Sequence, residues 1–260
     1  MATSQVDAVT ELQNAFQALT KNWILALPTA VVSLLEGIFG VLLLATALGG
    51  ALGAGALGAM HPGAALGMLA ASGIWFALGI VVLVLLSLLA NAIVVGAAEH
   101  VWHGQPPDLS GGVSKALARI PTLLALFGIA FVLGCVCLVL MVALGLGALL
   151  ALLLAFFFMY AMPAIIVGNQ GAVDALRTSY HLVRANIGPS ITAFIGIIVV
   201  LALGRIVTVL FSHIPVVNII VHFLVGGLTT AYAALVAVRF YDILRSPLSQ
   251  TTAVPVTPSI

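Results

Sequence analysis

Charged residues are scarce in this chain, and their scarcity excludes a soluble globular protein. Only 6% of the 260 residues are charged, whereas 63% are hydrophobic. A soluble domain carries about 25% charged residues, so these charges are too few to cover a surface in water. The net charge of +1 gives no field that would attract nucleic acid or an acidic partner. The composition therefore predicts a membrane protein that contacts membrane lipids and binds no nucleic acid.

The chain also lacks the alternation of apolar and polar residues that marks the strands of a membrane β-barrel. Its apolar runs are continuous, as in Val-Val-Leu-Val-Leu-Leu at 81–86. Helices and closed barrels are the two structures that satisfy every backbone polar group inside a membrane. The continuous runs therefore predict an all-α fold, a bundle of membrane helices.

Residues for catalysis or metal binding are equally few. No Gly-Lys-Ser/Thr, Gly-x-Ser-x-Gly or His-Glu-x-x-His sequence occurs. His100 and His103 share a helix face beside Glu99, but two histidines and one carboxylate are a weak metal pattern. Cys135 and Cys137 lie two apart in an apolar run, so they do not face each other and are expected to be buried free thiols. We predict no catalytic residue, no metal and no cofactor, and hence no enzyme.

Six apolar segments are long enough to cross a membrane, which takes about 20 residues per helix. Two come from the unbroken apolar tract 121–167, which suits two spans joined at the Gly-Leu-Gly of 145–147. The other four cover 23–48, 72–97, 189–211 and 216–238. The sequence therefore predicts three helical hairpins within 23–240, an amphipathic helix in 1–22, and a disordered cytoplasmic tail, rich in Ser, Thr and Pro, in 241–260.

Basic residues gather on one side of this six-span arrangement. The Gly/Ala-rich loop 49–67, the turn at 145–147 and the loop 212–215 contain no Lys, Arg, Asp or Glu. Seven of the eight basic residues fall on the opposite side: Lys21, Lys115, Arg119, Arg177, Arg184, Arg239 and Arg245. Cytoplasmic loops carry the excess of Lys and Arg, so both termini are expected in the cytoplasm.

The segments before the first, third and fifth spans repeat one pattern. Apolar residues recur at spacings of three and four in two of them, at Val9, Leu12, Phe16, Leu19 and Trp23 and at Val173, Leu176, Tyr180, Val183 and Ile187. At the same offset Asn22 aligns with Asn186, and a shorter third copy covers 112–117. Such stripes predict amphipathic helices in the membrane interface. These helices are expected either to bind anionic headgroups through Lys21, Lys115, Arg119, Arg177 and Arg184 or to serve only as connectors into the next span.

The most specific stretch of the sequence covers residues 160–190. A span ends in Met-Pro-Ala-Ile-Ile-Val-Gly at 162–168, and Ala-Leu-x-x-Ser-x-x-Leu-Val-Arg-x-Asn follows at 175–186. This stretch and the six-span layout resemble a group of uncharacterised prokaryotic multi-pass proteins, which includes the membrane domain fused to some bacterial glycerophosphodiester phosphodiesterases. The resemblance implies a six-span fold in the cytoplasmic membrane of a prokaryote. It carries over no catalytic residue of a phosphodiesterase.

Two charged residues fall inside predicted spans, where charge is costly and indicates function. Glu36 lies about 20 Å into the first span and Arg205 about 24 Å into the fifth, at about 1.5 Å per residue. We predict an ion pair between them; the alternative is that Arg205 reaches the outer headgroups while Glu36 is protonated or faces a wet cavity. Ser87 and Asn91 lie one turn apart on the second span, where they predict hydrogen bonds between helices or, alternatively, ion coordination.

Three functions are compatible with these features. The scarcity of polar residues in the spans favours a non-enzymatic scaffold, assembly factor or accessory subunit, acting through helix packing and through contacts with lipids and other membrane proteins. Internal repeats favour a small transporter or channel with its polar site around Glu36 and Arg205. The third is an intramembrane enzyme acting on lipids, for which no nucleophile and base occur at one depth. We expect the first.

Overall fold

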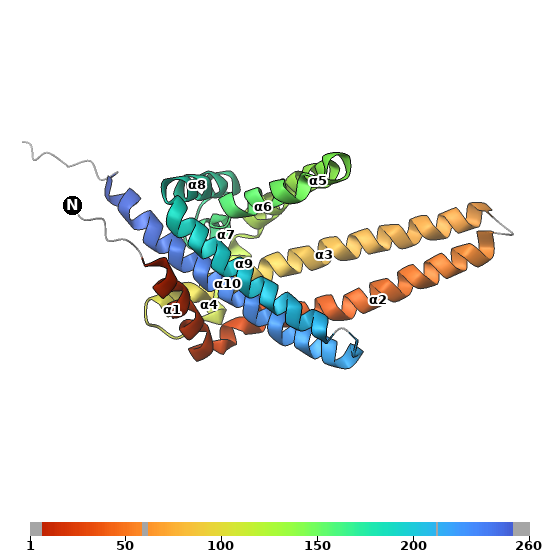
Figure 1. Ribbon diagram of the computed structural model, residues 1–260, viewed down its shortest axis with the longest axis horizontal. Coiled ribbons are helices and arrows are strands. Elements are labelled where there is room, and N and C mark those ends of the chain that lie inside the picture. Colours follow the sequence, from red (N-terminus) through yellow and green to blue (C-terminus); the bar gives the residue numbers. More distant parts are fainter. Residues whose placement is uncertain (1–6, 59–61, 212, 252–260) are drawn as a thin grey trace, which may run out of the picture.

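The structure is a computed structural model that describes residues 7–58, 62–211 and 213–251 (Figure 1). Its regular elements in these ranges are all helical, which confirms the all-α prediction for the described residues. They are α1 (Ala8–Lys21), η1 (Trp23–Ala26), α2 (Leu27–Gly58), α3 (Pro62–Trp102), α4 (Leu109–Ala118), α5 (Ile120–Leu144), α6 (Gly147–Phe157), α7 (Ala161–Ile166), α8 (Ala172–Ala185), α9 (Ile187–Leu210) and α10 (Pro215–Thr251).

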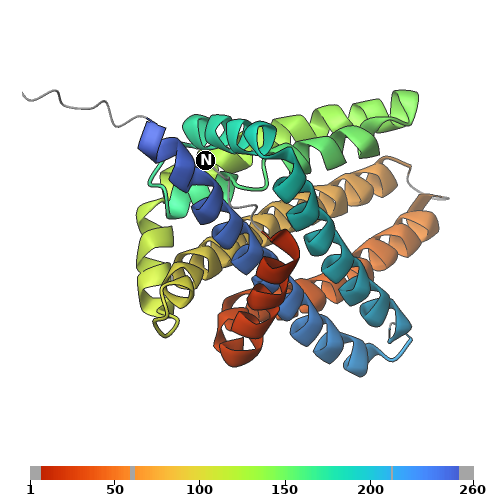
Figure 2. The same cartoon turned by 60° about the vertical axis from the view of Figure 1, so that its left-hand side comes forward.

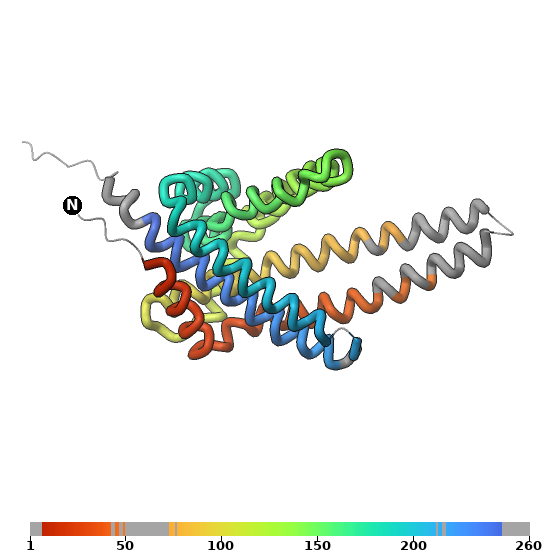
Figure 3. The backbone as a smooth tube through the Cα atoms, in the orientation of Figure 1, coloured from red at the N-terminus to blue at the C-terminus, as the bar shows by residue number. Residues whose placement is uncertain are grey.

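Six helical stretches of the described chain are long and apolar enough to cross a membrane. They are Trp23–Leu42, Gly73–Trp102, Ile120–Leu144, Gly147–Ile166, Ile187–Leu210 and Val217–Arg245. Their number agrees with the six predicted segments, and they are compatible with an integral membrane protein. Three pairs of helices that follow one another in the sequence also pack together: α2 with α3, α5 with α6, and α9 with α10. The backbone tube in Figure 3 shows these three pairs.

The first two long helices extend past the predicted spans. α2 continues to Gly58 and α3 begins at Pro62, so most of the predicted loop 49–67 is helical. No proline occurs between Pro28 and Pro62, and the glycines of this stretch are interspersed with Ala and Leu, which are strong helix formers. The two helices therefore lie side by side and reach away from the other helices at the right of Figure 1.

Glycine makes the tight turn between α5 and α6 possible. Gly145 ends α5 with a φ of 69°, a left-handed conformation that favours glycine. A Cβ atom on Gly147 would collide with the Cys137 carbonyl oxygen of α5. The turn predicted at 145–147 is therefore confirmed. Gly145 adopts the left-handed backbone conformation, and Gly147 allows α6 to approach α5 closely.

The helix predicted as the fourth span is broken, because α6 ends at Phe157 and α7 begins at Ala161. At the break the buried Ser179 hydroxyl donates to the Phe157 carbonyl (2.8 Å) and accepts from the Tyr160 amide (3.0 Å). One side chain of α8 thus satisfies two backbone groups that the break leaves free. Ser179 is the serine of the Ala-Leu-x-x-Ser motif, so this motif has a structural role here.

The two longer copies of the repeat found in the sequence end in the same bend. The backbone amide of Asn22 donates to the carbonyls three and four residues earlier, and that of Asn186 does the same. Each asparagine side chain also donates to the carbonyl four residues earlier, at 3.0 and 3.1 Å. In the shorter third copy, the Arg119 amide at the end of α4 instead donates to the carbonyls two and three residues earlier. The aligned asparagines therefore hold equivalent bends between a short helix and the long helix that follows.

The largest fully buried side chains gather at one end of the molecule. They include Tyr160, Ile165, Leu182, Leu235, Phe240 and Tyr241, from the α6–α7 break, α7, α8 and α10. The short helices α1, α4 and α8 surround this end (Figures 1 and 2). Lys21, Lys115, Arg119, Arg177 and Arg184 lie on or next to these helices, so this end is called the basic end below.

Ion pairs fix two of the short helices at the basic end. The Arg239 guanidinium of α10 bonds both carboxylate oxygens of Glu11 on α1, at 2.7 and 3.2 Å. The same guanidinium lies 4.9 Å from the centre of the Trp102 ring on α3, within the range of a cation–π contact. The Lys115 ammonium of α4 lies 2.6 Å from the Glu99 carboxylate of α3. Thus α1 is held to α10, and α4 is held to α3.

Small residues let α2 and α10 approach closely. A Cβ atom on Gly227 would lie 2.5 Å from the Ala30 Cβ, and one on Gly226 would lie 2.7 Å from the Ser33 Oγ. The Thr29 hydroxyl donates to the Gly227 carbonyl at 3.0 Å. Contacts between small residues are typical of helix pairs in membranes, and α10 is thereby a second packing partner of α2 besides α3.

The end of the chain differs from the prediction of a disordered tail that starts at residue 241. α10 continues to Thr251, and Tyr241 and Leu244 on it are 2% and 4% exposed. These side chains pack in the core of the basic end. Their burial stabilises the helix here, although the composition of the segment predicted disorder. The remainder of the predicted tail, 252–260, lies outside the described residues.

Candidate functional site

Glu36 lines a cavity of about 460 Å³ that is bordered by α2 and α3. Its distance along the helix from Trp23 is about 20 Å at about 1.5 Å per residue, whereas the hydrocarbon core of a bilayer is about 30 Å thick. The side chain is partly buried. The ion pairs of the described chain do not include Glu36, and no hydrogen bond joins its carboxyl group to another described residue.

Ser87 and Asn91 of α3 line the same cavity. From Trp102 at the basic end of α3, Asn91 lies about 17 Å and Ser87 about 22 Å along the helix. The three polar side chains therefore lie at similar depths. The rest of the lining is apolar: Ile80, Leu83, Val84 and Leu88. The sequence singled out Glu36 and the Ser87/Asn91 pair separately, and the structure brings them together because α2 and α3 are neighbours.

Arg205 does not join this site. Its side chain is exposed on α9, and within the described ranges it forms no ion pair with Glu36. The prediction assumed that the equivalent spans of two repeats would face each other. Instead α2 packs on α3 and α10, while α9 packs on α10, α1 and α8. The predicted Glu36–Arg205 pair is therefore absent, and Arg205 has the exposure that the alternative, an arginine reaching toward headgroups, requires.

Two polar residues of α10, a helix that also packs on α2, were not predicted as part of a site. The His222 ring lies 3.9 Å from the position that a Cβ on Gly37 would occupy. Asn218, one turn away, has a buried amide oxygen without a hydrogen-bond partner in the described chain. Their spacing of four residues in an apolar span was the available sequence signal, but neither residue has a charged neighbour in sequence to mark it.

The predicted headgroup-binding residues all lie at the basic end, with different partners. Lys115 pairs with Glu99, and the Arg119 guanidinium donates to the Asn169 side-chain oxygen. Arg177 and Arg184 are exposed on α8. Lys21 lines a polar cavity of about 510 Å³ together with Asn14, Gln17, Asn22 and Gln105. Lys115 and Arg119 are therefore engaged within the protein, whereas Arg177 and Arg184 present their charges outward.

The N-terminus of α1 is capped by Asp7. Its carboxylate accepts hydrogen bonds from the Thr10 hydroxyl (2.7 Å) and the Thr10 amide (3.3 Å). These bonds favour the charged carboxylate and lower the pKa of Asp7 from its ordinary value. A charged cap stabilises the start of the helix that carries Glu11, the partner of Arg239.

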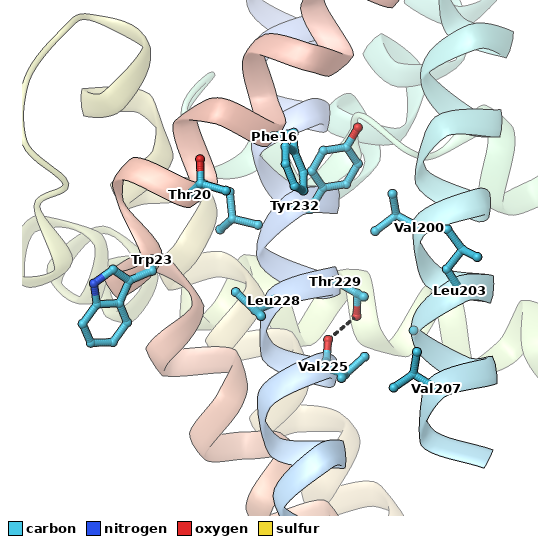
Figure 4. A pocket seen from close by; sticks show the side chains of 12 residues that line it. Phe16, Thr20, Trp23, Val200, Leu203, Val207, Val225, Leu228, Thr229 and Tyr232 are labelled. Carbon is cyan, nitrogen blue, oxygen red and sulfur yellow. Dashed lines mark hydrogen bonds between the residues drawn. The ribbon is translucent and has the colours of Figure 1, made fainter. Parts of the chain in front are cut away.

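An apolar groove of about 560 Å³ runs between α1, α9 and α10. Figure 4 shows Val200, Leu203 and Val207 of α9 along one wall, opposite Leu228 and Tyr232. Its few polar side chains offer little to a ligand: the Thr229 hydroxyl donates to the Val225 carbonyl (2.8 Å) and the Tyr232 hydroxyl to the Leu12 carbonyl (3.3 Å). The groove therefore suits acyl chains or apolar side chains.

Metal-ligating side chains are not grouped in the described part of the chain, where no set of three or more His, Cys, Asp or Glu residues is placed to hold a metal ion. Glu99 is occupied by Lys115, and His103 Nδ1 lies 2.8 Å from the Glu99 carbonyl oxygen. Cys135 and Cys137 are free thiols; Cys137 is buried as expected, whereas Cys135 is exposed on α5, so the expectation of burial is wrong for Cys135.

Comparison with known proteins adds no relative. No family model, no curated protein and no solved structure matches this chain. The resemblance to uncharacterised six-span proteins therefore stays a prediction that rests on residues 160–190 and the order of the spans.

Proposed function

We propose that the chain is a non-enzymatic scaffold, assembly factor or accessory subunit in the cytoplasmic membrane of a prokaryote. Its six apolar helices cross the bilayer as three hairpins, with both termini in the cytoplasm. The short helices α1, α4 and α8 lie in the cytoplasmic interface, where Arg177 and Arg184 contact anionic headgroups. This arrangement is supported by the basic residues at one end of the molecule and by the uncharged loops of the sequence.

The observation that carries the proposal is the small fraction of residues in the spanning helices that is buried inside the protein. In the most apolar part of α5, and likewise of α9, 11% of the residues are buried. One face of α5 presents Val132, Val139 and Val142, with side chains 62%, 65% and 81% exposed. Membrane helices associate by close packing of side chains, so such faces are available to helices of another protein as well as to lipid.

The distribution of polar groups also favours this function over transport. A transporter needs polar groups along a path between two faces of the membrane. Here Glu36, Ser87 and Asn91 share one cavity, whose lining does not include Asn218 or His222 of α10. A transporter or channel is the second candidate because of the cavity at Glu36, although Arg205 has no part in it.

A photo-crosslinking experiment in native membranes tests the proposal. A photoreactive amino acid at Val139 or Val142 reports what covers the exposed face of α5. We expect a discrete adduct with one other membrane protein, which also binds the purified chain in lipid nanodiscs. The exposed loop residue Gln105 is the matched control position, and it should not give the same adduct.

Two results would contradict the proposed function. One is that the α5 positions give adducts with lipids only. The other is that purified protein in vesicles carries a solute across the membrane, with a rate that falls in Glu36→Gln. The second result would favour the transporter.

A further inference from the structure

The apolar groove between α1, α9 and α10 has polar neighbours along α1. A second cavity, of about 400 Å³, shares three lining residues with the groove: Phe16, Val200 and Tyr232. This second cavity adds the side-chain amides of Gln13 and Gln17. Gln17 also lines the polar cavity that contains Lys21, and Lys21 directly follows Thr20 of the groove. Shared lining residues therefore connect an apolar groove, two amides and a lysine.

The groove has the length and volume of a site for one acyl chain. Its lining runs from Val200 to Val207 on α9 and from Val225 to Tyr232 on α10 (Figure 4), about 10 Å on each helix at about 1.5 Å per residue. The hydrocarbon of one leaflet is about 15 Å deep. A partner helix of the same length, about 10 Å across, would take roughly 800 Å³. The groove has a volume of about 560 Å³, so it is too small for a helix.

The walls of the groove offer no free polar group to an occupant. The hydroxyls of Thr229 and Tyr232 donate to backbone carbonyls, and the Thr20 hydroxyl donates to the Gln17 carbonyl at 2.9 Å. The lining residues Leu203 and Leu228 are 57% and 41% exposed, so the groove is open at the surface of the molecule. In the membrane proposed above, the molecule that reaches such a surface is a lipid tail.

The polar end of the groove selects for negative charge. The Lys21 ammonium forms no ion pair with the described residues, whereas Lys115 and Arg239 each pair with a glutamate. An ammonium and amide N–H groups are donors that a phosphate accepts. Among the described residues, no Asp or Glu lines any of the three cavities. The cationic part of a zwitterionic headgroup would therefore find no partner here.

We propose that this groove binds one anionic phospholipid. Its acyl chain lies between α1, α9 and α10, and its phosphate accepts hydrogen bonds from Lys21 and Gln17. The bound lipid fills the space that side chains leave between α1 and the two long helices. The inference rests on the membrane insertion proposed above and needs no partner protein, and the site is separate from the exposed arginines of α8.

Photoactivatable lipids test the site on the unmodified, purified chain in phosphatidylcholine vesicles. One vesicle preparation contains a little phosphatidylglycerol with a diazirine in its acyl chain, and the control preparation carries the diazirine on phosphatidylcholine. We expect the anionic probe to label segments 200–207 and 225–232 severalfold more than the neutral probe does. Both probes should label the exposed face of α5 equally.

The label on α5 separates failure of the site from failure of membrane insertion. Equal labelling of the groove by the two probes, or no label there while α5 is labelled, would overturn the lipid site and leave the proposed function to its own test. No label on α5 from either probe would contradict the insertion itself, and both proposals would then be wrong.

Two substitutions test the two ends of the site. Lys21→Gln is expected to lower the excess label from the anionic probe severalfold, and Leu203→Trp, which fills the groove, to lower the groove label from both probes. Ile206→Trp is the matched control, because Ile206 lies on α9 outside the groove and is 56% exposed, against 57% for Leu203. Label on α5 shows that each variant is still inserted. An unchanged preference in Lys21→Gln, or an unchanged groove label in Leu203→Trp, would overturn the assignment.

The competing occupant is an apolar segment of a protein. A photoreactive amino acid at Leu228 in native membranes distinguishes the two, and we expect it to form adducts with lipid. A discrete adduct with a second copy of the chain, or with another protein, would overturn the lipid site.

Discussion

The Ser179 hydroxyl makes two hydrogen bonds that hold the break between α6 and α7. Ser179 is fully buried, as is Tyr160, whose backbone amide donates a hydrogen bond to the Ser179 hydroxyl oxygen. A buried backbone group left without a partner costs about 1–3 kcal/mol. We therefore expect Ser179→Ala to lower the free energy of unfolding by about 1–3 kcal/mol or more. Chemical denaturation in detergent micelles measures this change.

The control for this change is Ser110→Ala on α4, an exposed serine without a hydrogen bond to the described residues. It removes the same atom and should change the stability by less than about 0.5 kcal/mol. Equal effects of the two substitutions would mean that water or another group satisfies the break, and Ser179 would lose its role.

At the residue scale, the sequence identified polar side chains but not their partners. Glu36, Ser87 and Asn91 stand out because polar groups are rare in apolar spans. Charge alone suggested Arg205 for Glu36, since both lie inside a predicted span. Which side chains meet depends on which helices are neighbours, and the packing of α2 against α3 and α10 is not encoded in the position of a single residue.

Helix pairing at the element scale depends on where a Cβ atom fits. Gly227→Ala would place a Cβ 2.5 Å from the Ala30 Cβ and 2.8 Å from its Cα, so α2 and α10 must separate. Overpacking of this kind typically costs about 1–3 kcal/mol. We expect a lower thermal unfolding midpoint for this variant in detergent.

Gly40→Ala on α2 is the matched control, because no atom lies within 4 Å of its new Cβ. It should raise the stability by about 0.5–1 kcal/mol, since alanine loses less backbone freedom than glycine in a helix. A stabilising effect of both substitutions would contradict the close approach of α2 and α10.

The attachment of α1 to α10 depends on the Arg239–Glu11 pair. Arg239→Gln removes both hydrogen bonds to Glu11 and the contact with the Trp102 ring. We expect faster hydrogen exchange of the α1 amides and little change in α8, followed by mass spectrometry. Arg245→Gln is the control, because Arg245 pairs with Asp242 and stacks on Tyr241 within α10. Unchanged exchange in α1 would show that apolar packing alone holds this helix.

Helices and turns were predictable where the spacing of apolar residues or a helix-breaking glycine marks them in the sequence. The helix in 1–22, the turn at 145–147 and the equivalence of Asn22 and Asn186 follow from spacing and glycine. The break at 158–160 lies in an unbroken apolar run, so no local signal marks it. It forms because Ser179, distant in sequence, satisfies the freed backbone groups.

The whole molecule has its core at the basic end and exposed apolar helices elsewhere, and this asymmetry leads to the last prediction. The proposed membrane insertion would account for it, with the polar contacts where the chain meets water and headgroups and the apolar ends of the long helices, at the right of Figure 1, in lipid. In the orientation proposed above, the loop with Gln105 would face the cytoplasm, and Leu146 and Ile214, in the turns at the other ends of their helices, would face the opposite side. These three exposed positions therefore report the orientation.

Single cysteines at these positions measure the orientation with a maleimide that does not cross membranes, after Cys135 and Cys137 are replaced by alanine. We expect Leu146→Cys and Ile214→Cys to react in intact cells with a permeable outer layer, and Gln105→Cys to react only in inverted vesicles. The positive-inside rule requires this result, because the basic residues are on the side of Gln105. Reaction of all three cysteines from one side would mean that the hairpins do not cross the bilayer.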